Sequence, residues 1–439
     1  MTRQIAWTAE KTFWSLIAFT VLVKLGVIWA GATLFYHADW AGHIFVDVWG
    51  WNEFVSKCQM GLIPYLQIPK EYPVGAGALY WLFSRFLPAN YTSQQLLLAH
   101  AVLTAAADIF NVGIFYSIAR QLNPPRAGWV TLFFILNATS LVLSPVRFES
   151  YVVLFVMIGY YFHKAGMSYW AVFFWSLGFS VKWFPVFFIV AQEVQAIAAK
   201  RKWQWAKSGA IFALVTGALN LPFILLNYLR FGNVDNWLWT YVFHMRRPLY
   251  WDTLLGVGEL WLGVLSWEKY AAYGSGLLVL ATFLYRPRMA IEYKAVLSCV
   301  AALVCNRSYS TQFHLWFYPF LLLIACLEPK RQMVKYLALF VALDVTNILV
   351  YPFFFASSIQ ELHGFVPLGA RFFGGHQTIL FSAAVCARSL FLIVLGVFVA
   401  NGPDEQEVPS SVRSGERPKG QSMPIPEWPA SGILAYQCG

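Results

Sequence analysis

Long apolar runs recur along the whole chain, and they constrain its fold more than any other feature. Two of the clearest are FWSLIAFTVLVKLGVIWAGATLFY at 13–36 and HQTILFSAAVCARSLFLIVLGVFVA at 376–400. Each is long enough to cross the ~30 Å hydrocarbon core of a bilayer as a helix. No small-residue cleavage signature accompanies the first run, which is therefore predicted to be a retained span rather than a signal peptide. The sequence predicts a polytopic all-α membrane protein.

Basic residues give this predicted topology its orientation. They collect in clusters between the apolar runs, which the positive-inside rule assigns to the cytoplasmic side. Such clusters account for the net charge of +10, and no basic run with interleaved aromatic residues indicates a nucleic-acid partner. Counting the crossings predicts about twelve spans with both termini cytoplasmic. The clusters are Arg3 and Lys11; Arg120 and Arg126; Lys164; Lys200, Arg201, Lys202 and Lys207; Arg286, Arg288 and Lys294; and Lys330, Arg331 and Lys335.

Segment 165–199 lies between two of these clusters, so the chain must cross an even number of times within it. Its length of about 35 residues leaves room for two short helices. A lysine and a proline at its middle, in SVKWFP, favour a hairpin over one straight span. The turn of this hairpin is predicted to carry Lys182 on the external side.

The same rule places other polar stretches on the external side with Lys182. They are segment 37–94, RFES at 147–150, VFHMRRPLYWD at 242–252 and NRSYSTQFHLW at 306–316. The alternative explanation is that these polar residues belong to unrelated external loops and form no common site. Residues 1–400 are predicted to form one transmembrane domain with 37–94 as an external loop. Residues 401–439, rich in Pro, Ser and charge, are predicted to be a disordered cytoplasmic tail.

The external polar residues are mainly basic, which suits a phosphate ligand. Charge-assisted hydrogen bonds from Lys and Arg neutralise phosphate or pyrophosphate groups. A phosphate at the membrane boundary indicates a lipid-linked molecule with its tail among the spans. The competing explanation is that these side chains extend to lipid headgroups. The cations concerned are Lys182, Arg147, Arg246 and Arg247.

Asp47 lies just beyond the first span, in IFVDVWGWNEFV. A carboxylate beside Trp49 and Trp51 can accept a proton from a sugar hydroxyl while an indole stacks on the sugar ring. His244 can transfer a second proton or donate a hydrogen bond near neutral pH, although a lone histidine more often has only a structural role. The rival carboxylates are Asp39, Glu53 and Glu71.

Other chemistries lack their motifs. The chain has no DxD pair, no close-spaced histidine set, no Walker loop and no GxGxxG, so neither a metal site nor a nucleotide site is predicted. The six cysteines lie mostly in or beside apolar runs without metal-ligand spacing and are predicted to pack as small apolar residues. Two i,i+3 pairs within spans are predicted to hold helices together: Asp108 with Asn111, and Asp344 with Asn347.

Taken in order, these motifs resemble the membrane-embedded glycosyltransferases of the GT-C superfold, in particular glycosyltransferase family 87. The resemblance is dispersed over most of residues 1–400. It rests on an external aspartate followed by G-x-x-PY and YP elements, an acidic and basic pair before a span, K-x-x-P, a His–Arg loop and S-x-Q-[YF]-x-x-W. Here they are Asp47, GLIPY (61–65), EYP (71–73), RFES (147–150), KWFP (182–185), HMRRP (244–248) and STQFHLW (310–316).

The resemblance implies transfer of a hexose, with mannose favoured, from a polyprenyl-phosphate donor to a lipid or glycan acceptor, with inversion and without a metal or other cofactor. Asp47 would be the general base. Lys182, helped by the arginines, would stabilise the phosphate leaving group, and His244 would contact the donor. Sugar or acceptor contacts would come from Trp49, Glu71, Tyr72, Glu149, Ser310, Gln312 and Trp316.

Two positions depart from the family pattern. Pro248 and a second arginine stand where the family usually shows a glycine and a less basic run, and Glu149 stands where related enzymes often have Asp. The main alternative is a transporter or flippase of a lipid-linked or amphipathic substrate. Such proteins commonly show internal repeats with interrupted helices in both halves. The KWFP segment has no counterpart in the second half, which favours the enzyme. A bacterial plasma membrane with an external active site is the favoured location.

Overall fold

A computed structural model gives the fold for residues 2–35, 46–201, 203–247, 249–250, 252–262, 268–354 and 377–404. Of these, residues 2–8, 34–35, 46–49, 268–269 and 377 are described by their backbone alone. The described residues fold into helices and contain no strand beyond two isolated bridges. This agrees with the predicted all-α class.

Five helices in the described ranges are long and apolar enough to cross a membrane, or six if one bent pair is a single span. The bent pair turns by 44° at Asn137 and consists of α5 (Pro124–Leu136) and α6 (Ala138–Leu143) with the 3-10 turn η3 (Ser144–Val146). The five are α1 (Thr2–Ala30) with η1 (Gly31–Phe35), α4 (Ser93–Leu122), α10 (Gln204–Phe231), α16 (Lys330–Ile348) with η5 (Leu349–Phe353), and α19 (Gln377–Ala400). The predicted count of about twelve is not reached among these residues.

Several apolar segments predicted as spans form shorter helices instead. At 1.5 Å per residue, the 16 residues of the second-longest reach roughly 24 Å, short of a ~30 Å hydrocarbon core. Turns and prolines interrupt these segments, and hydropathy averaged along the chain does not register such breaks. They are α7 (Glu149–Lys164), α8 (Ser168–Val181), α9 (Val186–Ala198), α13 (Glu268–Leu284), α14 (Ile291–Val304) and α15 (Tyr318–Leu327).

The hairpin predicted in segment 165–199 is present. Helix α8 ends at Val181, Lys182 is extended with φ −157° and ψ 145°, and α9 begins after Pro185. Proline lacks an N–H and is tolerated only at the start of a helix, so the break falls where the sequence placed it. Lys182 is buried at this turn rather than exposed on a loop.

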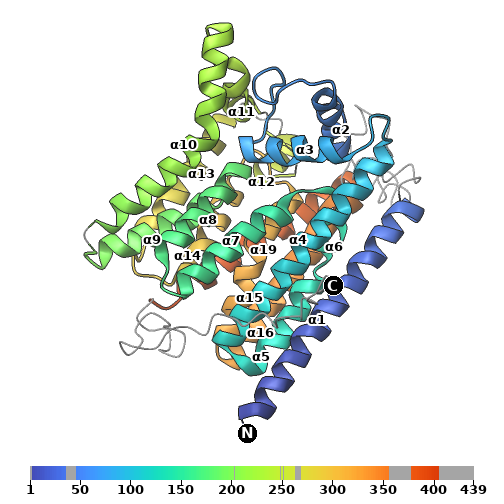
Figure 1. Ribbon diagram of the computed structural model, residues 1–439. Coiled ribbons are helices and arrows are strands. Elements are labelled where there is room, and N and C mark those ends of the chain that lie inside the picture. The colour runs from blue at the N-terminus through green and yellow to red at the C-terminus, as the bar shows by residue number, and fades with distance from the viewer. Residues whose placement is uncertain are drawn as a thin grey trace, which may run out of the picture.

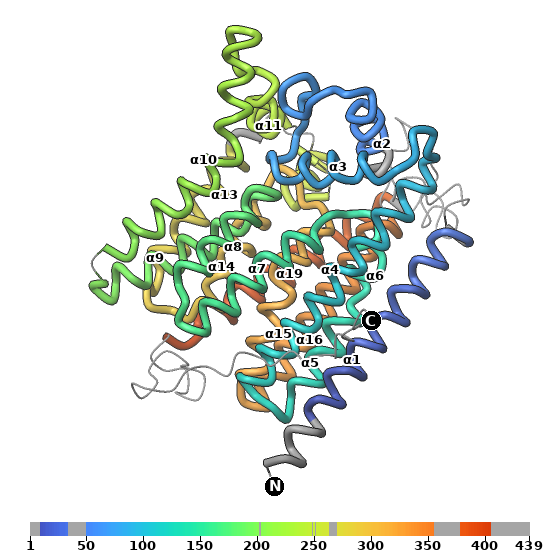
Figure 2. The backbone as a smooth tube through the Cα atoms, viewed as in Figure 1, coloured from blue at the N-terminus to red at the C-terminus, as the bar shows by residue number. Residues whose placement is uncertain are grey.

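Helix α15 lies at the centre of the bundle. Its residues from Tyr318 to Cys326 are all buried, and α4, α5, α14 and α16 pack around it. Helix α10 has the opposite character, since its most apolar stretch has no buried residue. The core therefore consists of the helices packed around α15, whereas α10 lies at the edge of the bundle (Figures 1 and 2).

The polar residues inside the long helices join helix to helix, as predicted. Asn111 of α4 donates to the Ser150 carbonyl at 2.9 Å, and Asp344 accepts from the backbone N–H of Thr139 at 3.0 Å. Asn347 donates to the Thr311 carbonyl at 2.9 Å. A further pair joins α1 to α4, Lys24 with Asp108 at 2.7 Å. Buried polar groups are stable only when paired, so these contacts fix the relative positions of the helices.

The remaining short elements gather at one end of the bundle, beside the start of α4 and the end of α10 (Figure 1). We call this the polar end, and the opposite one, which carries Lys11, Arg120, Lys164 and Glu292, the basic end. The polar-end elements are α2 (Val46–Gln59), α3 (Val74–Phe86), α11 (Asp235–Arg246), α12 (Leu254–Leu262) and η4 (Thr311–Trp316).

The predicted basic clusters do share one end. Lys164 pairs with Glu292 at 2.6 Å, and Arg288 donates to the Ala198 carbonyl at 3.3 Å. Which side of a membrane this end faces stays a prediction. The predicted tail begins later than residue 401, because Arg286 pairs with Asp404 at 2.9 Å and packs 401–404 against the bundle. Residues 405–439 lie outside the described part of the chain.

Candidate functional site at the polar end

The structure brings the predicted external polar stretches together. His244 of α11 is bonded through Nε2 to the carbonyl of Glu71, with a distance of 2.8 Å. Lys182 of the hairpin forms an ion pair with Glu149 of the RFES segment. The backbone of Tyr250 donates to the Arg307 carbonyl at 2.8 Å, which joins the 242–252 stretch to the 306–316 stretch. Segments far apart in the sequence therefore form one site.

Lys182 lies at the centre of this site. Its ammonium group is buried against Glu149 and faces aromatic rings contributed by separate segments. A cation within about 6 Å of a ring centroid is attracted by the ring quadrupole. The distances from Nζ to the ring centroids are 4.9 Å to Phe313, 5.0 Å to Phe148, 5.4 Å to Trp316 and 5.8 Å to Tyr72. We call Lys182, Glu149, these four rings, Arg147 and Arg247 the lysine cluster.

The arginines add further positive charge. Arg147 and Arg247 both lie near enough to Lys182 to repel its ammonium group. Arg147 is buried with Nη2 at 3.4 Å from the Tyr351 hydroxyl, and the Arg247 guanidinium lies 4.7 Å above the Tyr250 ring. Arg246, also predicted to bind phosphate, is exposed at the end of α11. Among the described residues the cluster therefore combines three cations with a single buried carboxylate, Glu149.

Some polar atoms of the cluster are buried without a hydrogen-bond partner in the described part of the chain. They are Oε2 of Glu149, Nε of Arg247 and Nε1 of Trp316. An unsatisfied buried polar atom costs about 1–3 kcal/mol, so native proteins keep few of them. A cation-rich cluster with unused N–H donors is suited to an anionic ligand that carries several acceptor oxygens.

His244 is held in a defined protonation state. Burial lowers the pKa of His244, the hydrogen bond to the Glu71 carbonyl raises it, and the charges of Arg247 and Lys182 lower it again. The net direction is downward, so the ring is neutral at neutral pH. A carbonyl only accepts, so Nε2 carries the proton and Nδ1 is left as the acceptor. The ring packs edge-on against Trp183 at 4.8 Å.

The predicted sugar-binding residues of η4 are buried. The Ser310 hydroxyl donates to Oε1 of Gln312, and Trp316 stacks on Phe184 with centroids 4.7 Å apart. Glu71 pairs with Lys70 at 3.3 Å. Burial raises the pKa of the Tyr72 hydroxyl well above its ordinary value, so this group remains protonated. Each of these residues lies at the polar end.

Asp47 and Trp49 lie in the first turn of α2, and their side chains fall outside the described residues. One turn further on, Trp51 stacks on Tyr80 with centroids 3.7 Å apart and meets Phe148 edge-on at 6.1 Å. The backbone of α2 therefore places Asp47 one helical turn before Trp51, which contacts a ring of the lysine cluster.

Two aromatic residues of the cluster were missed at the sequence level. Phe148 lies within RFES, and Phe313 is the [YF] position of STQFHLW; neither was assigned a role, and only their proximity to Lys182 gives them one. The sequence could have indicated a role for them only through their place in or beside these motifs. This indication is weak, because the chain has 38 phenylalanines.

Arg388 was also missed, and it connects the two loops that border the cluster. It is buried on α19, donates to Oδ1 of Asn347 at 3.1 Å and to the Asp252 carbonyl, and lies 3.9 Å over the Tyr309 ring. The Asp252 carboxylate in turn accepts from the Tyr309 N–H at 3.3 Å. A single arginine within the apolar run 376–400 was the available signal, because a charge inside a span is rarely accidental.

Within the described part of the chain, no group of three or more His, Cys, Asp or Glu side chains is arranged to hold a metal ion. Comparisons with protein-family models, curated proteins and solved structures find no match to this chain.

Proposed function

We propose that the protein is an integral membrane glycosyltransferase of GT-C architecture that transfers a hexose, mannose foremost, from a polyprenyl-phosphate donor to a lipid or glycan acceptor. The observation that carries this proposal is the lysine cluster. At the polar end Lys182 pairs with Glu149, and Arg147 and Arg247 lie near Lys182. The order of motifs shared with glycosyltransferase family 87 supports the same function.

The charge of the cluster supports this function. Lys182 pairs with Glu149, and the charges of Arg147 and Arg247 both act on Lys182, so an added phosphodiester is attracted rather than repelled. The ammonium group of Lys182 has three hydrogens, and the ion pair with Glu149 uses one of them. Arg247 keeps a buried Nε without a partner among the described residues. Donors therefore remain for a phosphate at this place.

The apolar surroundings of the cluster also support this function. A phosphate carried by a lipid needs a cationic site whose surroundings are apolar, and the Lys182 ammonium group is ringed by Phe148, Phe313 and Trp316. Aromatic faces also suit a sugar ring, which stacks its C–H face on them. The unpartnered indole N–H of Trp316 can donate to a sugar hydroxyl.

The proposed reaction assigns one role to each group. Asp47 accepts the proton of the acceptor hydroxyl, whose oxygen attacks the anomeric carbon. The bond from that carbon to the phosphate oxygen breaks, and its electron pair leaves with the polyprenyl phosphate. Lys182, Arg147 and Arg247 stabilise the negative charge on this leaving group, an electrostatic contribution usually among the largest in catalysis. Glu149 holds Lys182 in place through their ion pair.

Transfer of radiolabelled sugar from a panel of polyprenyl-phosphate sugars to membrane acceptors tests this proposal. Asp47→Asn removes the base with little change in shape, and we expect transfer to fall by roughly 10²–10⁴-fold while donor binding is retained. Asp235→Asn is the matched control, because Asp235 is an exposed acid in the first turn of α11. It should transfer at the rate of the native chain.

A different result would reject the enzyme. If no donor supports transfer and labelled lipid instead crosses the bilayer at equal rates in the native chain and in Asp47→Asn, the protein is a transporter or flippase. If Asp47→Asn transfers normally while Glu71→Gln does not, the base is misassigned and the reaction class is retained.

A further inference from the structure

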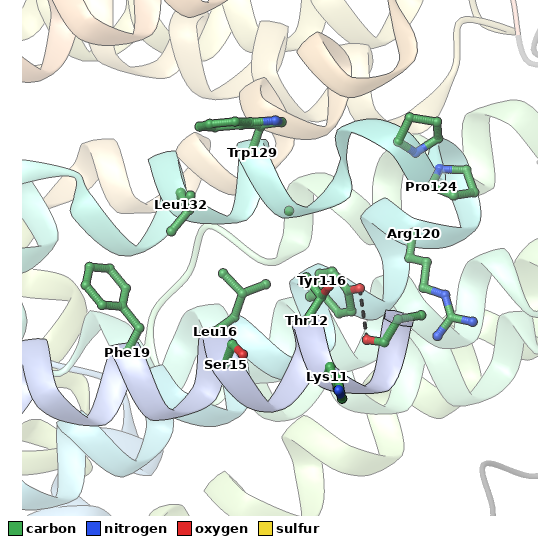
Figure 3. Close-up of a pocket in the computed structure, with 13 residues that line it drawn as sticks. Lys11, Thr12, Ser15, Leu16, Phe19, Tyr116, Arg120, Pro124, Trp129 and Leu132 are labelled. Atoms are coloured by element: carbon green, nitrogen blue, oxygen red, sulfur yellow. Dashed lines mark hydrogen bonds between the residues drawn. The ribbon is translucent and has the colours of Figure 1, made fainter. Parts of the chain in front are cut away.

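A groove lined by residues of α1, α4 and α5 lies near the basic end (Figure 3). Its volume is about 1090 Å³, slightly above the range of roughly 300–1,000 Å³ that is typical of small-molecule pockets. Helix α1 is held to α4 on one side, where the Tyr116 hydroxyl donates to the Ala9 carbonyl at 3.2 Å. The groove opens on the other side, toward α5.

The two ends of the groove differ in chemistry. Lys11 of α1 and Arg120 of α4 lie at one end, beside Pro124 (Figure 3). Phe19 and Leu132 lie at the other end, and Leu16 lies between the two ends of the groove. A cationic mouth that continues into an apolar channel has the charge pattern of a molecule with an anionic head and a hydrocarbon tail.

The location of the groove points to the same kind of molecule. Both helices that border its opening belong to segments long and apolar enough to cross a membrane, α1 as one helix and α5 as part of the bent pair. The cationic mouth lies at the end that gathers the basic clusters. Basic pockets between transmembrane helices on the side rich in Lys and Arg bind anionic lipid headgroups.

We propose that this groove binds an anionic phospholipid, with its phosphate between Lys11 and Arg120 and one acyl chain along Leu16, Phe19 and Leu132. Such a lipid fills the space between α1 and α5 and fastens α1 to the bundle. The site is separate from the proposed transfer reaction, since it lies at the opposite end of the helices and shares no residue with the lysine cluster.

Native mass spectrometry of the full chain in nanodiscs of equal phosphatidylglycerol and phosphatidylcholine tests the proposal. We expect the native chain to retain phosphatidylglycerol in excess. The double variant Lys11→Gln/Arg120→Gln should lower the ratio of retained phosphatidylglycerol to phosphatidylcholine by roughly 30-fold, about fivefold for each charge. Lys200→Gln/Arg201→Gln is the matched control, because both residues are exposed and neither lines the groove.

A second variant fills the groove without removing a charge. A Cβ at Gly128 would stand 3.8 Å from Cγ2 of Thr12, which is ordinary contact, and Gly128 lines the groove, so we expect Gly128→Phe to place its ring there. It should abolish retention of both lipids at this site. Gly209→Phe on α10 is the control, because nothing lies within 4 Å of a Cβ there.

Three results would overturn the proposal. An unchanged lipid ratio in Lys11→Gln/Arg120→Gln would show that the cations do not select the headgroup. Unchanged retention in Gly128→Phe would show that the lipid sits elsewhere. A dimer that Gly128→Phe converts to monomer would assign the groove to a second copy of the chain. None of these readouts depends on sugar transfer, so they leave the proposed function to its own experiment.

Discussion

Helix α7 carries a buried lysine–glutamate pair at each of its ends. At its first turn Glu149 pairs with Lys182, and at its last turn Lys164 pairs with Glu292, 2.6 Å apart. Both pairs follow the helix dipole, because each glutamate lies in the first turn of its helix, and each lysine lies at the last turn or just beyond it. Each glutamate also keeps one oxygen without a hydrogen-bond partner among the described residues.

The two pairs differ in what surrounds them. Glu292 also accepts a hydrogen bond from the Tyr160 hydroxyl, so one carboxylate is shared by a lysine and a neutral donor. Glu149 pairs with Lys182, and the charges of Arg147 and Arg247 act on that lysine. The pair of Lys164 and Glu292 balances one positive with one negative charge and holds α7 to α14. The pair of Lys182 and Glu149 has additional positive charge around it. The two ion pairs are of the same kind, and what differs is the charge around them.

The largest expected effect is on stability at the neutral pair. Removing one partner of a buried ion pair leaves an uncompensated charge and costs about 3–5 kcal/mol. Lys164→Met should lower the free energy of unfolding by this amount, measured by equilibrium denaturation in micelles. The double variant Lys164→Met/Glu292→Leu should recover most of the loss, since replacing both partners by apolar residues is often nearly neutral. A single variant as stable as the native chain would contradict the structural role of this pair.

Lys182→Met should give the contrasting result. The positive charges of Arg147 and Arg247, which lie near Lys182, would remain in the cluster, so the stability loss should be clearly smaller than that of Lys164→Met. Sugar transfer should fall by roughly 10²–10³-fold, as expected when a group that stabilises developing charge is removed. Denaturation and transfer measured on the same two variants would sharpen the comparison. Equal stability losses, with transfer unaffected in Lys182→Met, would mean that both pairs are structural.

The sequence predicted part of this arrangement. A lysine and a proline in the middle of an apolar segment are a local signal, and the hairpin with Lys182 at its turn follows from it. The four rings around Lys182 come from three segments, which carry Tyr72, Phe148 and the pair Phe313 and Trp316. Their convergence depends on tertiary packing that no local pattern encodes. The charge surplus follows from the same packing, because Arg147 and Arg247 are a hundred residues apart in the chain.

The predicted number of spans failed for a related reason. Apolar composition identifies residues that avoid water, and residues buried against protein satisfy it as well as residues facing lipid. Helix α15 is wholly buried and too short to cross a membrane, whereas the exposed α10 is long enough. Apolar runs therefore identified both helices but could not tell the central, buried one from the exposed, outer one.

The smallest expected effect, and the most specific test of the excess positive charge in the lysine cluster, concerns His244. Its pKa is lowered by burial and by the charges of Arg247 and Lys182, so protonation would add a further cation to a cluster already rich in them. The unfolded chain, with an ordinary histidine pKa near 6.5, binds this proton more readily than the folded chain. Stability contributed by the neutral ring is thus present above about pH 6.5 and is lost as the pH falls toward the lower folded-state pKa.

His244→Gln keeps an amide N–H for the Glu71 carbonyl but cannot be protonated in this range. Thermal unfolding of the native chain and the variant should therefore converge as the pH falls from 7.5 to 5, with the native chain losing more stability. A constant difference between the two across this range would show that the surrounding cations do not act on the ring. The surplus of charge at this end of α7 would then be smaller than the geometry indicates.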